Sequence, residues 1–208
     1  MYDHERRERK NNGDIQHVAM PPRDPKGNAL MYSYLTEREL DYELAVANGW
    51  YATVFRGHRV VIPCINSAGF NYWQARAMLD HPLRYDSPAI PRKDSIVMLW
   101  PNHAPKDVGM SENTVVITEG PMDALAAAEF YPAIALMGGK PSDEVLSFIE
   151  QKTEALGLVN WVVVPDADNL GLVDEFLAHD HPVLAVLPSG KDLAGMPRWE
   201  REKLLGKL

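Results

Sequence analysis

The second half of the chain repeats one pattern, a short apolar run followed by a segment with helical character. The apolar runs predict strands at residues 115–117, 133–137, 161–164 and 183–187. The intervening segments predict helices from Pro121, after Ser142, near residues 171–178 and near residues 197–206. Pro121 suits a first helical turn because its missing N–H would have no partner there, and Ser142 is a favoured N-cap. The alternation predicts an α/β fold with a parallel sheet covered by helices.

The start of the chain has a weaker pattern. Residues 1–30 are polar and rich in turn residues, so we expect a flexible N-terminal segment there. Apolar positions then recur at helical spacing, which predicts a helix over residues 35–48. Thr36 and Glu39 have the spacing of a capping box for that helix.

The middle of the chain reads as a small β-rich unit. Strands are expected at residues 51–55, 59–63, 70–76 and 95–100. The first two flank the turn-like Arg56-Gly57-His58 and should form a hairpin. We therefore expect a small mixed α+β lobe over residues 31–111, followed by the α/β domain over residues 112–208.

Composition narrows the class of protein. No apolar run approaches the roughly 18 residues of a membrane span, and the charged first ten residues are followed by no apolar core typical of a secretory signal. Cys64 is the only cysteine, which excludes an internal disulfide and a cysteine-rich zinc site. We expect a cytoplasmic protein without a membrane partner and without zinc.

Charge is unevenly spread along the chain. Residues 1–111 carry 14 Lys and Arg against 13 Asp and Glu, whereas residues 112–208 carry 7 against 16. Such an acidic half normally argues against binding nucleic acid, whose phosphates attract Lys and Arg. Bound divalent cations would reverse that expectation by supplying positive charge locally.

Several of these acids stand where predicted strands end. They are Glu119, Asp123, Asp166, Asp168 and Asp192. Glu119 and Asp123 are four residues apart at the junction of a strand and a helix, which places both at one site. Ligands of open parallel sheets bind beyond the carboxyl ends of the strands, and hard cations such as Mg²⁺ prefer oxygen ligands. The sequence therefore predicts a divalent-metal site at this edge.

The same motifs carry a resemblance to a known family. Glu119-Gly-Pro-Met-Asp123, Gly138-Gly139, Asp166-Ala-Asp168 and Gly190-Lys-Asp192 resemble the Toprim domain, a Rossmann-like parallel sheet with flanking helices, in its bacterial DnaG-type and phage primase version. In the first half, Arg59, Trp73-Gln-Ala-Arg76, Arg84-Tyr85 and Lys93 resemble the basic N-terminal lobe of the primase core. The resemblance covers about residues 35–195 in the family's order.

The resemblance implies a DNA primase core, a nucleotidyltransferase that joins ribonucleoside triphosphates into short RNA primers on a single-stranded DNA template. It implies that Glu119, Asp166 and Asp168 are catalytic and bind two or more Mg²⁺ or Mn²⁺ ions, with Asp123 and Asp192 in support. The residues implied to bind nucleic-acid or nucleotide phosphates are Arg59, Arg76, Arg84, Lys93 and Lys191. Trp73 is expected either to pack in the core or to stack a base beside Arg76.

Two departures from the family pattern stand out. Pro121 replaces a common aromatic residue, and Ala194 replaces a second acid beyond Asp192, which weakens the expected outer metal site. A zinc ribbon cannot be built from one cysteine, so a primase of this kind would obtain template selection or helicase coupling from a separate protein, or would work without them. Two alternatives remain open at this point: a Toprim nuclease with the same carboxylates, and a non-catalytic DNA-binding accessory of replication.

Overall fold

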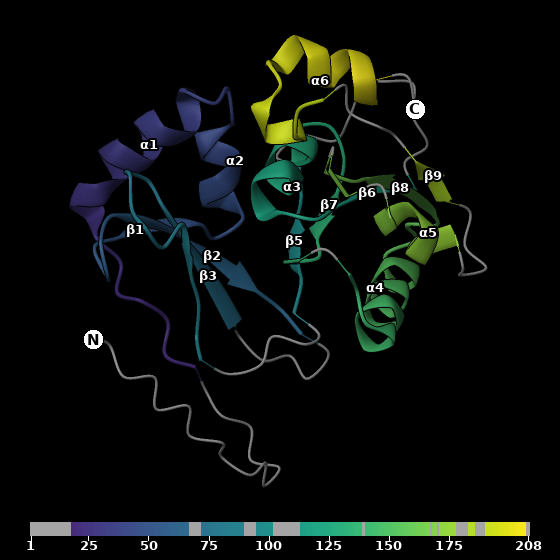
Figure 1. Cartoon of the computed structure of the whole chain (residues 1–208), viewed down its shortest axis with the longest axis horizontal. Coiled ribbons are helices and arrows are strands. Elements are labelled where there is room, and N and C mark those ends of the chain that lie inside the picture. Colours follow the sequence, from purple (N-terminus) through teal and green to yellow (C-terminus); the bar gives the residue numbers. More distant parts are fainter. Residues whose placement is uncertain are drawn as a thin grey trace, which may run out of the picture.

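The fold was analysed in a computed structural model of the chain. The structure describes residues 18–66, 72–89, 95–101, 113–138, 140–166, 168–169, 171–177, 183–185 and 190–206. Figure 1 shows two sheets side by side, with the chain passing from the N-terminal lobe to the larger α/β unit. None of the helices in these ranges is long and apolar enough to cross a membrane.

The N-terminal lobe is built on a four-stranded antiparallel sheet. Its strands are β1 (Tyr51–Thr53), β2 (Arg59–Cys64), β3 (Tyr72–Ala77) and β4 (Tyr85–Asp86), in the order β1-β2-β3-β4. The expected hairpin is confirmed: β1 pairs with β2, and the turn between them uses positive φ at Arg56 and Gly57. No strand was predicted at β4, which forms because Tyr85 and Asp86 pair with the edge of β3.

The helices of the lobe differ from the prediction. A 3₁₀ turn, η1 (Pro25–Gly27), leads into α1 (Asn28–Thr36), and α2 spans Tyr42–Ala47. The predicted single helix over residues 35–48 is therefore wrong, as is its capping box. The chain turns at Glu39, which has a φ of 53°, and Asp41 caps α2 by accepting a hydrogen bond from Leu44 N.

Part of the expected flexible segment is packed against the lobe. Over residues 18–30 the chain enters η1 and α1 and also contacts the sheet. Tyr51 donates its hydroxyl hydrogen to Pro21 O at 2.8 Å, and Asp24 N donates to Ala52 O at 2.9 Å. These residues are thus an ordered part of the lobe, and residues 1–17 lie outside the described ranges.

The second sheet has five strands in the order β5-β7-β6-β8-β9. They are β5 (Val97–Leu99), β6 (Thr114–Thr118), β7 (Ala133–Ala135), β8 (Asn160–Val164) and β9 (Val183–Ala185). β6, β7, β8 and β9 pair in parallel, which confirms the α/β prediction. β5 comes from the segment assigned to the lobe, yet it adds antiparallel to the β7 edge of this sheet.

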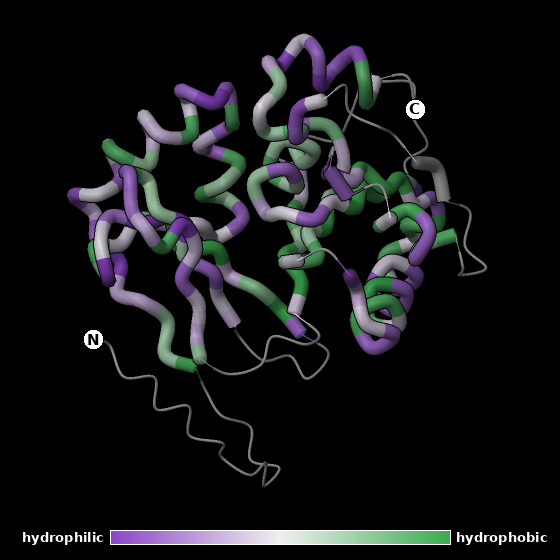
Figure 2. The backbone as a smooth tube through the Cα atoms, in the orientation of Figure 1, coloured by the Kyte–Doolittle hydropathy of each residue, from purple (hydrophilic) through white to green (hydrophobic). Residues whose placement is uncertain are grey.

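Helices cover both faces of the second sheet, as its alternating side chains require. Its helices are α3 (Pro121–Ala128), α4 (Asp143–Ala155), α5 (Gly171–Leu177) and α6 (Arg198–Leu205), with a short 3₁₀ turn, η2 (Leu193–Gly195), before α6. Val116 and Val162 face a core shared with α3 and the lobe, whereas Ile117 and Val163 face a separate core under α4 and α5. Figure 2 shows hydrophobic and hydrophilic residues alternating along α4, as expected for a helix with one buried side.

The lobe and the α/β unit are joined at several points. Ile65, after β2, and Ile96, before β5, exchange backbone hydrogen bonds of 2.9 and 2.8 Å. Asn48 at the end of α2 bonds to both backbone groups of Trp100. The two halves thus form one packed body, and the space beside their contact is where the candidate site lies.

Candidate acidic and basic site between the two sheets

Glu119 and Asp166 come together because β6 and β8 are neighbours in register. Thr118 pairs with Val164, so both strands end at the same level of the sheet. Glu119 follows β6 directly, and its Oε1 accepts a hydrogen bond from Asp166 N at 3.1 Å. The strand ends therefore place two carboxylates side by side, as the sequence predicted.

Asp123 reaches the same place from the first turn of α3. Its side chain is buried, and its Oδ1 accepts a hydrogen bond from Ala194 N at 2.8 Å. The helix can begin this close because residue 120 is glycine: a Cβ there would lie 3.0 Å from Asp123 Oδ2. Ala194, which stands where the resemblance led us to expect an acid, thus contributes its backbone N–H to the site.

These residues line a pocket of about 310 Å³, here called the acidic pocket. Its walls are formed by Gln74, Arg76, Arg84, Tyr85, Glu119, Gly120, Pro121, Asp123, Met137, Gly138, Asp166 and Asp192. The prediction that the strand ends converge holds for Glu119, Asp123, Asp166 and Asp192. Asp168 is exposed and does not line the pocket, although its charge acts on Asp166.

Crowding of like charges marks two of the carboxyls. Burial, followed by the negative charges of the four neighbouring carboxylates, raises the pKa of Asp166 from its usual 3.8 to about 7. Burial also raises the pKa of Asp123 to about 6, against the lowering effect of its hydrogen bond from Ala194. Both shifts mean that the pocket disfavours additional negative charge, which a bound cation would relieve.

The carboxylates of the acidic pocket are separate groups and not a ready-made metal site. Across the described ranges, no three or more His, Cys, Asp or Glu side chains are arranged so that they could hold one ion. The carboxylates face one pocket as separate groups. Mg²⁺ is commonly held by one or two carboxylates together with waters and substrate phosphates, so these residues fit ions that arrive with a phosphate ligand.

The basic wall of the pocket comes from the lobe. Arg76 on β3 is buried and donates hydrogen bonds to the hydroxyls of Tyr34 and Tyr85. Burial lowers the pKa of Arg76, but the neighbouring Tyr85 and Tyr34 raise it by more, so the net shift is upward. Arg84, just before β4, is exposed and also lines the pocket. Positive and negative side chains from two sheets therefore face each other.

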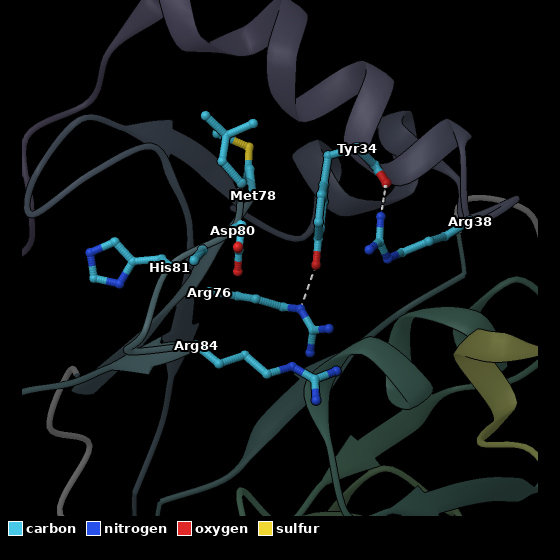
Figure 3. A pocket seen from close by; sticks show the side chains of 9 residues that line it. Tyr34, Arg38, Arg76, Met78, Asp80, His81 and Arg84 are labelled. Carbon is cyan, nitrogen blue, oxygen red and sulfur yellow. Dashed lines mark hydrogen bonds between the residues drawn. The ribbon is translucent and has the colours of Figure 1, made fainter.

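Arg76 and Arg84 also line a second pocket of about 390 Å³, here called the lobe pocket. Its other lining residues are Tyr34, Arg38, Ala77, Met78, Leu79, Asp80 and His81. Figure 3 shows Tyr34 between Arg38 and Arg76, with His81 at the far side. The two pockets are adjacent because they share two arginines.

Arg59 and Trp73 were predicted to contact nucleic acid, but both side chains lie on the other face of the lobe sheet from Arg76. Arg59 is fully buried, and its guanidinium bonds to the carbonyls of Arg56, Ala75 and Leu83 and to His81 Nδ1. Trp73 is buried against Phe55, and its indole N–H donates to Ala19 O at 3.1 Å. Neither side chain is available to a phosphate or a base. Alternation along β3 places Gln74 and Arg76 on one face and Trp73 on the other.

The two lysines predicted to bind phosphates are not part of either pocket as described. Lys191 is exposed beside Asp192 and does not line either pocket. Lys93 lies outside the described residues.

Tyr34 and Arg38 were missed by the sequence analysis. They are four residues apart around the end of α1, a spacing that brings their side chains together. The misplaced helix hid this signal because it began where α1 in fact ends.

Comparisons with known proteins support the fold. No family model matches the chain, and no curated protein matches its sequence. Among solved structures, a DnaG primase catalytic domain bound to single-stranded DNA is similar over 88% of this chain and 71% of that one, with 16% identity and a TM-score of 0.59.

Two further solved structures are similar in the same way. The RNA polymerase domain of Mycobacterium tuberculosis primase DnaG, in complex with double-stranded DNA, shares 19% identity, covering 87% of this chain and 74% of that one, with a TM-score of 0.59. A DNA primase domain from Pseudomonas aeruginosa shares 17% identity, covering 82% of this chain and 67% of that one, with a TM-score of 0.57. At these identities the likeness establishes the fold, which is that of the DnaG primase catalytic core with its Toprim sheet.

Proposed function

We propose that the chain is the catalytic core of a DNA primase, which synthesises short RNA primers on single-stranded DNA by metal-dependent nucleotidyl transfer. The observation that carries this proposal is the acidic pocket itself. Four carboxylates of the Toprim sheet and two arginines of the lobe line the same space of about 310 Å³. A pocket lined by carboxylates on one side and arginines on the other suits a ligand that carries phosphates together with bound cations.

The carboxylates are proposed to hold two or more Mg²⁺ or Mn²⁺ ions. Glu119 and Asp166 are the inner ligands, with Asp168 beside them and with Asp123 and Asp192 in support. When bound, the ions would neutralise the incoming triphosphate and lower the pKa of the attacking 3′-hydroxyl. Asp166 N donates a hydrogen bond to Glu119 Oε1, which holds the Glu119 carboxylate against the backbone at Asp166.

The arginines are proposed to bind phosphates of the template strand or of the ribonucleoside triphosphate. Arg76 is held by two neutral hydroxyls and so keeps its full positive charge in the pocket wall. Similar solved structures are complexes with single- and double-stranded DNA, which supports a nucleic-acid partner. A replicative helicase or a template-selecting protein is proposed to direct the core to its initiation site.

The test is primer synthesis on single-stranded DNA with labelled ribonucleotides and Mg²⁺ or Mn²⁺. Wild type would run beside Glu119→Gln and Asp166→Asn, with Glu154→Gln as the matched control, since Glu154 is an exposed carboxylate of α4 away from the pocket. We expect each pocket variant to lose about 100-fold or more of the rate, the scale typical of losing a transition-state contact, and the control to match wild type.

Other outcomes would identify the alternatives. Template cleavage that is lost in both pocket variants would replace the primase with a Toprim nuclease. Binding of DNA without either activity, and without any effect of the pocket variants, would favour a non-catalytic accessory of replication.

A further inference from the structure

Tyr34 contacts two arginines of the lobe pocket with two different parts of its side chain. The guanidinium carbon of Arg38 lies 4.0 Å from the centre of the Tyr34 ring, and Arg38 Nη1 donates to Tyr34 O at 3.0 Å. The Tyr34 hydroxyl accepts a hydrogen bond from Arg76 Nε. Figure 3 shows Arg38 beside the ring and Arg76 at its hydroxyl end. Tyr34 of α1 therefore contacts one arginine from the turn after α1 and one from β3.

The contact with Arg76 orients that side chain without neutralising it. Arg76 bonds to the hydroxyls of Tyr34 and Tyr85, and within the described ranges it forms no ion pair with a carboxylate. A guanidinium carries five N–H donors, so donors remain for a ligand. Arg76 and Arg38 both line the lobe pocket.

Burial makes the Tyr34 contact effective. Tyr34 is only 5% exposed, so water cannot readily replace its hydroxyl as the partner of Arg76. A long arginine side chain loses considerable rotamer freedom when a ligand immobilises it, and a preformed hydrogen bond removes part of that cost before binding. The ring beneath Arg38 acts in the same way through a cation–π contact.

We propose that Tyr34 is a positioning residue that sets Arg38 and Arg76 as a paired guanidinium grip for one phosphate-bearing ligand in the lobe pocket. This inference rests on the proposed function, because it assigns the phosphate to the nucleic-acid strand or the nucleotide that the core uses. The shared chemistry is the phosphate, and binding assays with each source separate the two.

The experiment measures affinity for two probes, fluorescein-labelled oligodeoxythymidine and ATP with Mg²⁺. Tyr34→Phe removes only the hydroxyl, whereas Tyr34→Leu also removes the ring beneath Arg38. Tyr32→Phe is the matched control, since Tyr32 lies on the same helix, is 54% exposed and lines neither pocket. Each variant is also made in an Arg76→Ala background, and thermal unfolding checks that all variants fold.

For the probe that occupies the lobe pocket, we expect Tyr34→Phe to weaken affinity about three- to tenfold, the range of one hydrogen bond. Tyr34→Leu should weaken it further, and Tyr32→Phe should leave it unchanged. In primer synthesis, KM for that ligand should rise by the same factor while kcat changes less. In the Arg76→Ala background, Tyr34→Phe should have no further effect, because the hydroxyl acts through Arg76.

Two results would overturn the inference. The first is that Tyr34→Phe binds both probes as wild type does. The second is that the effect of Tyr34→Phe persists undiminished without Arg76, which would indicate a general packing role. In either case wild-type primer synthesis and a weakened Arg76→Ala variant would leave the proposed function intact. Wild type that binds neither probe would instead refute the proposed function and this inference together.

Discussion

The surroundings of Asp166 disfavour the ionised form of its carboxyl group. Burial and the charges of Asp123, Glu119, Asp192 and Asp168 raise its pKa to about 7. In the unfolded chain the same group titrates near 3.8. The folded protein therefore binds more protons than the unfolded chain between about pH 4 and pH 7, so stability falls as pH rises through that window. Metal-free protein should be more stable near pH 5 than near pH 8 on this account.

Asp166→Asn tests this directly. Without divalent cations at pH 8 we expect the variant to be more stable than wild type by about 1 kcal/mol, a value discounted because the group is partly exposed, or about 2–4 °C in Tm. At about pH 3, below both pKa values, the carboxyl is mostly protonated in both states and the difference should nearly disappear. Thermal unfolding in the presence of a chelator measures it, and a variant less stable than wild type at pH 8 would contradict the explanation.

Arg59 and Arg76 lie on neighbouring strands, and the face of the sheet that each occupies decides whether it can reach a ligand. Arg59 pairs with Ala77 in the β2–β3 ladder, and Val60 pairs with Arg76, so the two arginines point to opposite faces of the sheet. Arg59 donates its hydrogen bonds to backbone carbonyls inside the lobe, whereas Arg76 lines both pockets. The resemblance implied that Arg59 contacts phosphates, but a motif match does not show which face of the strand is buried.

At the level of elements, α6 connects the α/β unit to the lobe. Arg201 is fully buried and bonds to Glu129 at the end of α3 and to Glu39 O in the turn after α1. Arg198 N donates to a carboxylate oxygen of Glu39 at 2.8 Å. Burial raises the pKa of Glu129, and Arg201 and Arg198 oppose that shift. The helix therefore joins the end of α3 to the turn after α1, and Figure 1 shows α6 lying next to α3.

Arg201→Met should destabilise the protein by about 3 kcal/mol or more, because it leaves the buried Glu129 carboxylate without its buried partner. Arg198→Ala removes an ion pair to the same carboxylate from an exposed arginine, and it should cost about 1 kcal/mol or less. Chemical denaturation measures both. Equal losses in the two variants would show that burial of the pair is not what matters.

The helix boundaries of the lobe were mispredicted because two capping options competed. Thr36 with Glu39 matches a capping box locally, but Asp41 makes the observed cap to Leu44 N. The chain between them must turn so that α1 and α2 both pack on the lobe core, which contains Met31, Leu35 and Leu44. Burial of that apolar surface outweighs a local cap of about 1 kcal/mol.

At the level of the whole molecule, the acidic pocket exists only where the two sheets meet. Its acids belong to the α/β unit, and its arginines belong to the lobe. The described carboxylates form no ready-made cage for an ion, so cations and phosphates should support each other's binding.

We therefore expect Mn²⁺ alone to raise Tm slightly and Mn²⁺ with ATP to raise it more, by about 5–10 °C when the ligand stands roughly 100-fold above its Kd. Glu154→Gln should respond as wild type does, and Glu119→Gln should lose most of the added stability. Differential scanning calorimetry measures the shifts. ATP and Mn²⁺ effects that merely add would argue against a shared site.

Local sequence patterns were enough to predict the α/β unit and the convergence of Glu119, Asp123, Asp166 and Asp192 at one edge of its sheet. Apolar periodicity, Pro121 and the Ser142 cap act within a few residues, and a carboxylate that follows a parallel strand must lie at the carboxyl edge. Only the tertiary structure decided that β5 joins the second sheet, that Arg59 turns inward and that Tyr34 reaches Arg76. Those outcomes depend on pairing and packing between segments that are distant in the sequence. A pattern within a few residues cannot predict the energies of such contacts.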